Sequence, residues 1–329
     1  MSIETIEYRN LDATVLSFNE YEAIILNGRG CNVIEFRQTN KELSLLHFPE
    51  DAELDEFSRS PQRFGNAVLF HPNKIEGCRF VRNGITYDYL AHNIPGSHGI
   101  IKELPFECIA THEDLESVSA SFLFSSKTTP YYAEFHWDFN LIFEFTLSKD
   151  GLTQTMSFEN VGDTAIPFGF GFHTSFRIPF DDHQTAGDYK IFASCGKRWE
   201  VNGSNCPSGN LIDLSADFIK DGVKPLSLGL SEHTTAITCD FSMLHPSLHD
   251  LHGAVIWDTV TDTKLIFETD PEFTNWMIWN NNASDNYVCI EPMTWIIDAP
   301  NAKVPDSVSG FRFIEPGCGW NAKNRLYVL

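Results

Sequence analysis

The sequence lacks the marks of a membrane-spanning, secreted or disulfide-linked chain. No apolar run approaches the ~18 residues that a transmembrane helix needs. The N-terminal stretch, MSIETIEYRN, contains no basic segment followed by an apolar core, so we expect no secretory signal. The 8 cysteines form no CxxC pair, and their scattered spacing favours neither a disulfide framework nor a zinc ribbon. We therefore expect reduced thiols in a soluble, cytoplasmic protein.

Positive charge is also scarce. The chain has 23 basic against 45 acidic residues, which gives a net charge of −22 at pH 7. A surface of this kind repels nucleic acid and anionic membranes, so neither is an expected partner. One local group of basic residues, Arg63, Lys74, Arg79 and Arg82, is either a basic edge or a site for a phosphate group.

Motifs for nucleotides, metals and nucleophiles are missing. The short glycine pairs at 28–30 and 169–171 lack the third glycine of a dinucleotide fingerprint, and there is no Walker or GxSxG motif. His245, His249 and His252 have helical spacing that could hold a metal ion. A proline after the first of them and the shortness of the segment favour an exposed turn instead. We predict neither a metal ion nor a cofactor.

Short stretches of alternating apolar and polar residues are abundant, and 27 phenylalanines supply much of their apolar side. They cover residues 14–18, 32–38, 132–147, 264–269 and 286–292. Asn-Gly and Asp-Gly turn signals separate many of them. Helical periodicity is limited to one or two turns over 209–218 and 245–252. The pattern predicts an all-β sandwich or barrel, and without a linker we expect one domain over 1–329.

The segment FGFGFHTSFRIPF, residues 168–180, is the most informative of these stretches. Read as a strand, it has one face of Phe168, Phe170, Phe172, Phe176 and Ile178, and another of Gly169, Gly171, His173, Ser175 and Arg177. The phenylalanine face is typical of a buried sheet. The glycines leave room beside His173 for a ligand or a second backbone. His173 is then either a proton-exchanging group or a core histidine bonded to backbone.

Glu291 stands in an apolar strand, YVCIEPMT, at residues 287–294. Alternation places it on the same face as Tyr287 and Cys289 and opposite Val288 and Ile290. Burying a carboxylate without a partner is costly. Glu291 is therefore either held in a structural salt bridge or prepared as a general base.

Several other polar or aromatic residues suit ligand contact. His98 lies in a glycine-containing loop, and such loops often carry binding groups. Asn73 and Lys74 either bind ligand hydroxyls or cap a turn. Four tryptophans occur late in the chain and offer flat apolar platforms for a sugar ring, although we expect at most two to touch a ligand: Trp257, Trp276, Trp279 and Trp295.

Three segments together resemble the aldose 1-epimerase, or galactose mutarotase-like, family. They are GNAVLFHPNKIEGCRFVRNGITYDYLAHN at 65–93, which leads to His98, FENVGDTAIPFGFGFHTSFRIPF at 158–180, and YVCIEPMTWIIDAPN at 287–301. The resemblance implies a large antiparallel β-supersandwich. It also implies anomeric interconversion of a monosaccharide, with Glu291 as general base, His173 as general acid, and His98 at the ring oxygen or a hydroxyl.

Further substrate contacts follow from the same resemblance, at Asn73, Lys74, Asn275 and, in TCDF, Asp240. Lys74 stands where the family commonly has arginine, and a lysine is a flexible point charge instead of a planar fork. Ala67 replaces a frequent proline, and the histidine motif reads His-Thr-Ser-Phe. Two alternatives stay open: an epimerase acting on a hexose 6-phosphate, and a sugar-binding protein of the same fold without turnover.

Overall fold

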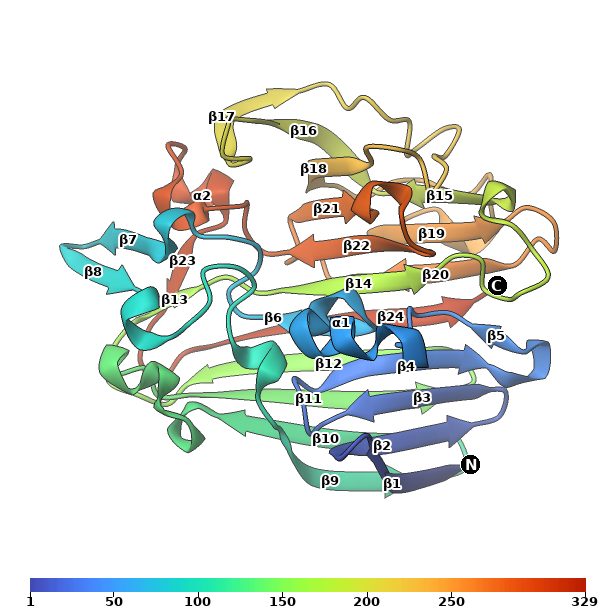
Figure 1. Cartoon of the computed structure of the whole chain (residues 1–329), viewed down its shortest axis with the longest axis horizontal. Helices are drawn as coiled ribbons and strands as arrows, with labels where there is room; N and C mark the ends of the chain where they lie inside the picture. The colour runs from blue at the N-terminus through green and yellow to red at the C-terminus, as the bar shows by residue number, and fades with distance from the viewer.

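The computed structural model describes residues 1–329, and two large antiparallel sheets dominate it (Figure 1). The larger has 12 strands, in spatial order β1 (Ser2–Tyr8), β2 (Leu11–Phe18), β3 (Tyr21–Leu26), β4 (Asn32–Gln38), β6 (Asn66–Leu69), β14 (Gly171–Arg177), β22 (Tyr287–Met293), β21 (Asn275–Trp279), β18 (Ser231–Ala236), β16 (Cys195–Val201) and β17 (Pro207–Ile212), with β5 (Leu43–Ser44) paired to β4.

The second sheet has 8 strands: β15 (Tyr189–Ala193), β19 (Gly253–Asp258), β20 (Lys264–Glu268), β24 (Gly319–Val328), β12 (Gly151–Asn160), β11 (Phe139–Ser148), β10 (Ser117–Ser125) and β9 (Glu107–Glu113). Two small hairpins pair β7 (Arg79–Arg82) with β8 (Ile85–Asp88) and β13 (Ile166–Phe168) with β23 (Arg312–Ile314). The only α-helices are α1 (Leu54–Arg59) and α2 (Asp306–Ser309). This is the predicted all-β supersandwich. No helix is long and apolar enough to cross a membrane.

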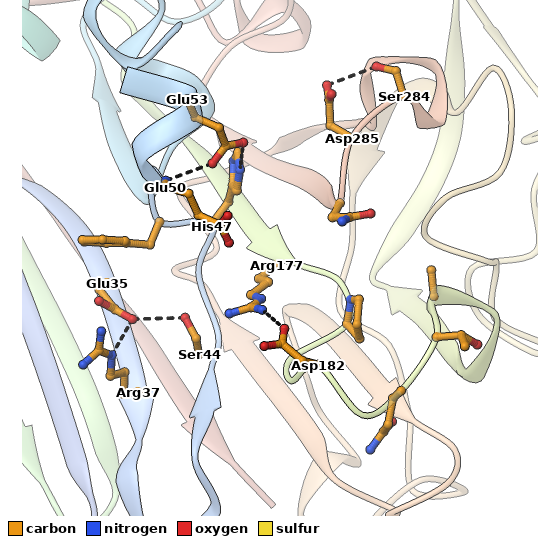
Figure 2. Close-up of a pocket in the computed structure, with 16 residues that line it drawn as sticks. Glu35, Arg37, Ser44, His47, Glu50, Glu53, Arg177, Asp182, Ser284 and Asp285 are labelled. Atoms are coloured by element: carbon orange, nitrogen blue, oxygen red, sulfur yellow. Dashed lines mark hydrogen bonds and ion pairs between the residues drawn. The ribbon is translucent and has the colours of Figure 1, made fainter. Parts of the chain in front are cut away.

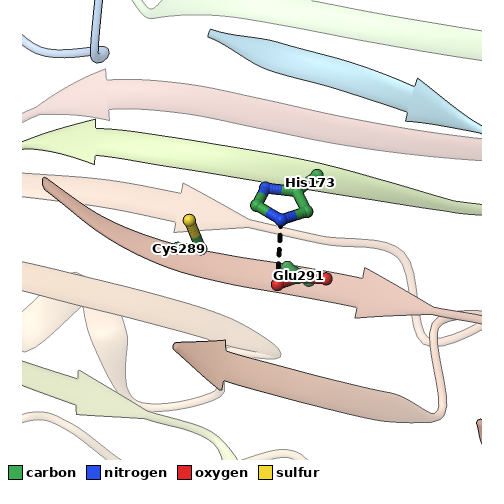
Figure 3. A group of neighbouring side chains, drawn as sticks. All are labelled: His173, Cys289 and Glu291. Atoms are coloured by element: carbon green, nitrogen blue, oxygen red, sulfur yellow. Dashed lines mark ion pairs between the residues drawn. The ribbon is translucent and has the colours of Figure 1, made fainter. Parts of the chain in front are cut away.

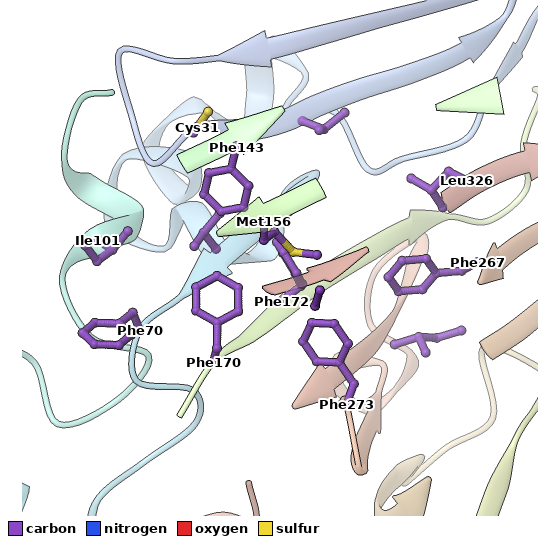
Figure 4. Close-up of a cluster of buried hydrophobic side chains, with 14 of the residues drawn as sticks. Cys31, Phe70, Ile101, Phe143, Met156, Phe170, Phe172, Phe267, Phe273 and Leu326 are labelled. Atoms are coloured by element: carbon purple, nitrogen blue, oxygen red, sulfur yellow. The ribbon is translucent and has the colours of Figure 1, made fainter. Parts of the chain in front are cut away.

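The core lies between the two sheets and is largely aromatic. One cluster of 66 buried side chains draws on both sheets, so no boundary divides it. Phe172 on β14 lies 6.4 Å, ring centre to ring centre, from Phe143 on β11 (Figure 4). Phe176 on the same strand lies 5.6 Å from Phe267 on β20. Burying one such ring stabilises the fold by about 1.5–3 kcal/mol. A one-residue shift of β14 would expose both rings, so the core fixes which face of β14 points outward.

Three predicted segments differ from the structure. Residues 132–147 were expected as one strand, but Pro130–Phe135 forms a 3₁₀ helix and β11 begins at Phe139, because Pro130 starts a helical turn. Residues 209–218 contain the end of β17 and no helix, whereas 245–252 contains one 3₁₀ turn, Pro246–Leu248. The 168–180 segment is broken after β13, where the backbone N–H of Phe170 donates to Oγ1 of Thr294 before β14 begins.

Candidate active site

His173 and Glu291 lie next to each other on neighbouring strands. β14 and β22 are antiparallel, and the pairing of Ser175 with Cys289 sets His173 beside Glu291. The Nε2 atom of His173 is 3.4 Å from Oε1 of Glu291 (Figure 3). Only 5% of His173 and 2% of Glu291 is exposed. Nδ1 of His173 and Oε2 of Glu291 have no hydrogen-bond partner, so the pair retains capacity to bond a ligand.

The two faces of β14 are those predicted from its alternation, but the glycines serve packing. A Cβ added to Gly169 would lie 2.2 Å from the Trp295 ring, and one added to Gly171 would lie 2.8 Å from the carbonyl oxygen of Pro292. The glycines therefore admit a tryptophan ring and a neighbouring backbone, not a ligand. This packing holds β14 against β22 and so fixes where His173 lies.

Burial changes the proton affinity of both members of the pair. It raises the pKa of Glu291 well above its ordinary value. It lowers the pKa of His173 well below its ordinary value, and His98 and the positive charge of Arg63 add to this effect. Glu291 therefore accepts a proton more readily than an exposed glutamate, and protonated His173 gives one up more readily than an exposed histidine. This arrangement suits proton exchange with a bound molecule.

The loop after β8 brings His98 to the pair. The His98 ring centre lies 5.5 Å from that of His173, with the rings nearly perpendicular. The backbone N–H of His98 donates to the carbonyl oxygen of Asn73 over 2.7 Å, which ties the two loops together. Nδ1 of His98 is shielded from solvent and has no partner. The side-chain oxygen of Asn73 accepts from the backbone N–H of Lys74 over 2.9 Å, so it also caps its own turn.

A cavity of about 610 Å³, here termed the Trp279 cavity, opens beside the pair. Met277, the cross-strand partner of Glu291, forms part of its wall, and the ring centre of Trp279 lies 6.2 Å from that of His173. Its other lining residues include Asn73, Lys74, Arg198, Trp199, Glu200 and His233. The Nζ atom of Lys74 donates to the carbonyl oxygen of Ser204. Flat indole rings among a few polar groups are typical of a sugar site.

Sequence reasoning missed His233. Cross-strand pairing links His233 on β18 to Met277 on β21, and Met277 to Glu291 on β22. A row of side chains therefore crosses four strands from His173 to His233. His233 is 4% exposed, both of its ring nitrogens lack partners, and burial lowers its pKa to about 3. In the sequence it is a single histidine in a short polar strand, and no motif distinguishes it.

Two of the expected substrate contacts lie outside this cavity. Asp240 is exposed in the loop after β18, where its carboxylate accepts from the backbone N–H of Ser242 over 2.8 Å. The chain has left the sheet at this point, and Asp240 does not line this cavity. Asn275 is buried, and its side-chain oxygen accepts from Nε1 of Trp199 over 3.0 Å. Asn275 thus bonds to Trp199, which forms part of the cavity wall.

The basic group and the tryptophans also separate in space. Arg63 lies over the Trp279 ring at 5.5 Å, and Lys74 lines the cavity, but Arg82 pairs with Asp306 and lies with Arg79 elsewhere. The four do not form a single phosphate site.

Of the four late tryptophans, only Trp279 lines the cavity. The indoles of the other three donate hydrogen bonds within the fold: Trp257 to Asp262, Trp276 to Ser194 and Trp295 to Pro72.

One group of buried side chains carries atoms of the kind that bind metal ions. Ligand atoms of His173, Cys289 and Glu291 lie within 4.8 Å of one another (Figure 3). Burial raises the pKa of the Cys289 thiol well above its ordinary value, and Sγ lies 3.3 Å from Oγ of Ser175. Among the three spaced histidines, Nε2 of His252 bonds to the Phe273 carbonyl oxygen over 3.0 Å.

A larger cavity of about 750 Å³, here termed the Arg177 cavity, lies where β14 ends (Figure 2). Its charged groups largely pair with one another. Arg177 bonds to Asp182, Nε2 of His47 lies 3.0 Å from Oε1 of Glu53, and Glu35 accepts from Arg37 and from Ser44. No pair like His173 and Glu291, with unpartnered atoms on both members, occurs there.

Fold and site together define a β-supersandwich protein with a buried acid/base pair beside a cavity. The chain belongs to the aldose 1-epimerase family, whose sequence model matches residues 12–326. It is similar over 100% of its length to a galactose mutarotase-like protein from Clostridium acetobutylicum, with 28% identity, 98% of that chain covered and a TM-score of 0.92.

Two more distant structures share the fold. A putative aldose 1-epimerase from Escherichia coli K12 is 18% identical, with a TM-score of 0.72 over 100% of this chain and 99% of that one. A galactose 1-epimerase from Lactobacillus acidophilus is 11% identical, with a TM-score of 0.72 over 100% and 98%. At these identities the likeness concerns the fold.

Proposed function

We propose that this protein interconverts the α and β anomers of a free aldose by acid/base ring opening. The observation that carries the proposal is the buried contact between His173 and Glu291, 3.4 Å apart, beside a cavity walled by Trp279. The pair offers a base and an acid within reach of the two oxygens on one anomeric carbon. Membership of the aldose 1-epimerase family supports the same chemistry.

The reaction needs two proton transfers in each direction. Glu291 takes the proton of the C1 hydroxyl while protonated His173 donates one to the ring oxygen, and the bond between C1 and the ring oxygen breaks. The open aldehyde rotates about C1–C2 and recloses as both protons return. Each positioned transfer contributes about 10²- to 10⁴-fold in rate. Once Glu291 is ionised and His173 protonated, the raised pKa of Glu291 and the lowered pKa of His173 make both transfers more favourable.

The remaining cavity residues hold the sugar. The Trp279 ring offers an apolar face beside the pair, and His98 stands next to His173 with an unpartnered nitrogen. Asn73 and Lys74 lie on the rim and bind hydroxyls. An aldose carrying a phosphate is the second candidate, because Lys74 and Arg198 both line the cavity and would attract an anion.

Polarimetry tests the proposal. Freshly dissolved α-glucose, α-galactose and glucose 6-phosphate are followed with the wild-type protein, with Glu291→Gln and with Glu35→Gln. Glu35 is a matched control, because it is also 2% exposed in the same sheet but lies in the Arg177 cavity. We expect the wild type and Glu35→Gln to accelerate the interconversion of anomers. Glu291→Gln should lose this acceleration. Equal rates in Glu291→Gln and wild type would contradict the assignment, and faster turnover of glucose 6-phosphate would favour the second candidate. Binding of sugars without acceleration would make the chain a non-catalytic binder.

A further inference from the structure

His233 is a buried imidazole that the fold leaves unsatisfied. It is 4% exposed, and neither ring nitrogen has a hydrogen-bond partner. Such groups are rare, because desolvating a polar atom without a bond destabilises the fold. His252 provides a contrast within the same protein: it is 9% exposed and bonds to the carbonyl oxygen of Phe273. The unpaired nitrogens of His233 therefore point to a ligand.

The place of His233 connects it with the proposed reaction. It lines the Trp279 cavity and stands in the row that leads through Met277 to Glu291. Adjacent strands are about 4.8 Å apart, so the backbones of His233 and Glu291 are separated by roughly 10 Å. Met277 lies between them, so a sugar ring that reaches Glu291 lies over Met277, within reach of His233 on the far side.

The order of the row matches the order of oxygens around a pyranose. His173 serves the ring oxygen and Glu291 serves the hydroxyl on C1, and the next oxygen around the ring is the hydroxyl on C2. His233 is the polar side chain beyond Glu291, on the side away from His173. A neutral imidazole has one donor and one acceptor, and a hydroxyl can either accept from the donor nitrogen or donate to the acceptor nitrogen.

We infer that His233 recognises the C2 hydroxyl of the aldose and thereby sets substrate specificity. This inference rests on the proposed function. It predicts that a sugar without that hydroxyl leaves a buried imidazole unpaired. The loss of one such bond weakens recognition by about 10- to 100-fold.

The test compares glucose, 2-deoxyglucose and 3-deoxyglucose as substrates of the wild type, His233→Leu and the matched control His252→Leu. In the wild type, 2-deoxyglucose should show a KM about 10- to 100-fold above that of glucose, with kcat changed far less. In His233→Leu, the KM for glucose should rise by the same factor, while the KM for 2-deoxyglucose should rise little further. His252→Leu should keep the wild-type preference, and His233→Gln, with one donor and one acceptor, should restore part of it.

Two results would overturn the inference: a wild type that treats glucose and 2-deoxyglucose alike, or a His233→Leu variant that keeps the wild-type preference for the C2 hydroxyl. If His233→Leu does not fold, the same comparison is made with His233→Ala. Failure of the proposed function is a separate outcome, seen as absence of acceleration by the wild type on every sugar. In that case calorimetry measures the affinities of the wild type and His233→Leu for glucose and 2-deoxyglucose. A preference for glucose that is lost in His233→Leu would still support the inference.

Discussion

The Trp279 and Arg177 cavities use their polar groups differently. The Arg177 cavity is the larger, about 750 Å³ against about 610 Å³, and it holds more charged side chains. Those charges bond to one another, as Arg177 does to Asp182 (Figure 2). Next to the Trp279 cavity, His173, Glu291 and His233 each keep at least one buried polar atom without a partner.

This difference teaches that unsatisfied buried groups mark a site better than volume does. A surface charge that already has a partner has little interaction left for a ligand. A buried group without one destabilises the protein until something binds it. Three such residues, His173, Glu291 and His233, lie in one row across β14, β22, β21 and β18.

The largest effect should follow removal of the acid. We expect His173→Asn to lower kcat/KM for mutarotation by about 10²- to 10⁴-fold, because asparagine cannot donate a proton to the ring oxygen. Polarimetry measures the rate, and circular dichroism checks that the variant is folded. Wild-type rates in a folded His173→Asn variant would show that the unpartnered pair beside the Trp279 cavity does not mark it as the active site.

The free energy of unfolding should decrease at acid pH because of the buried histidines. Burial lowers the pKa of His233 to about 3 and that of His71 to about 4, against about 6.5 in the unfolded chain. Below pH 6.5 the unfolded state binds more protons, so stability is complete above pH 6.5 and falls as the pH drops toward these values. Each histidine contributes at most about 1.4 kcal/mol per pH unit.

Urea unfolding at pH 6.5 and pH 5 measures this effect. His233→Gln should lose about 1–2 kcal/mol less than the wild type over this interval, because one buried titrating group is gone. The Glu291 carboxyl, whose pKa is raised, acts with the opposite sign but is present in both proteins. An identical loss in the two proteins would show that His233 is not held neutral by burial.

A smaller effect is expected at the rim of the Trp279 cavity. Lys74→Met removes the ammonium that bonds to Ser204 and lines the cavity. We expect KM to rise about 5-fold, as for one lost hydrogen bond, with kcat nearly unchanged. Steady-state mutarotation kinetics measure this, with Lys74→Arg as the control that keeps the charge. A kcat loss as large as that of His173→Asn would place Lys74 in the chemistry instead.

The smallest effect is expected in the Arg177 cavity. Arg177→Met breaks the partly exposed ion pair with Asp182. Pairs of this kind contribute about 0.2–1 kcal/mol, so the urea midpoint should shift slightly and kcat/KM should stay within about 2-fold of the wild type. A loss of activity above about 10-fold would show that the two cavities act together.

The alternation of residues along the chain predicted most of the site. It gave the strands at 32–38 and 264–269 nearly to the residue, and it separated the phenylalanine face of β14 from the face of His173. It also placed Glu291 opposite Val288 and Ile290, both of which lie in the core. These predictions succeeded because the side-chain period of a strand is local and burial enforces it.

The errors arose where the position of a side chain depends on residues far along the chain. Gly169 reads as a clearing for a ligand, yet Trp295, far away in sequence, fills it. Asp240 was expected to contact the substrate, and the structure places it after the end of the strand, outside the lining of the Trp279 cavity. His233 gave no signal, because its lack of a partner is known only when its surroundings are.

The sequence by itself therefore determined the sheet-forming segments and the outward face of β14, and it singled out His173 and Glu291 as candidates. Only the tertiary structure decided that His173 and Glu291 are adjacent, that His233 joins their row and that the charged groups of the larger cavity largely pair with one another. The physical reason is that alternation depends only on residues that are neighbours in the sequence. Strand order and the pairing of buried polar atoms are set by contacts between residues that lie more than a hundred positions apart, such as His173 and Glu291.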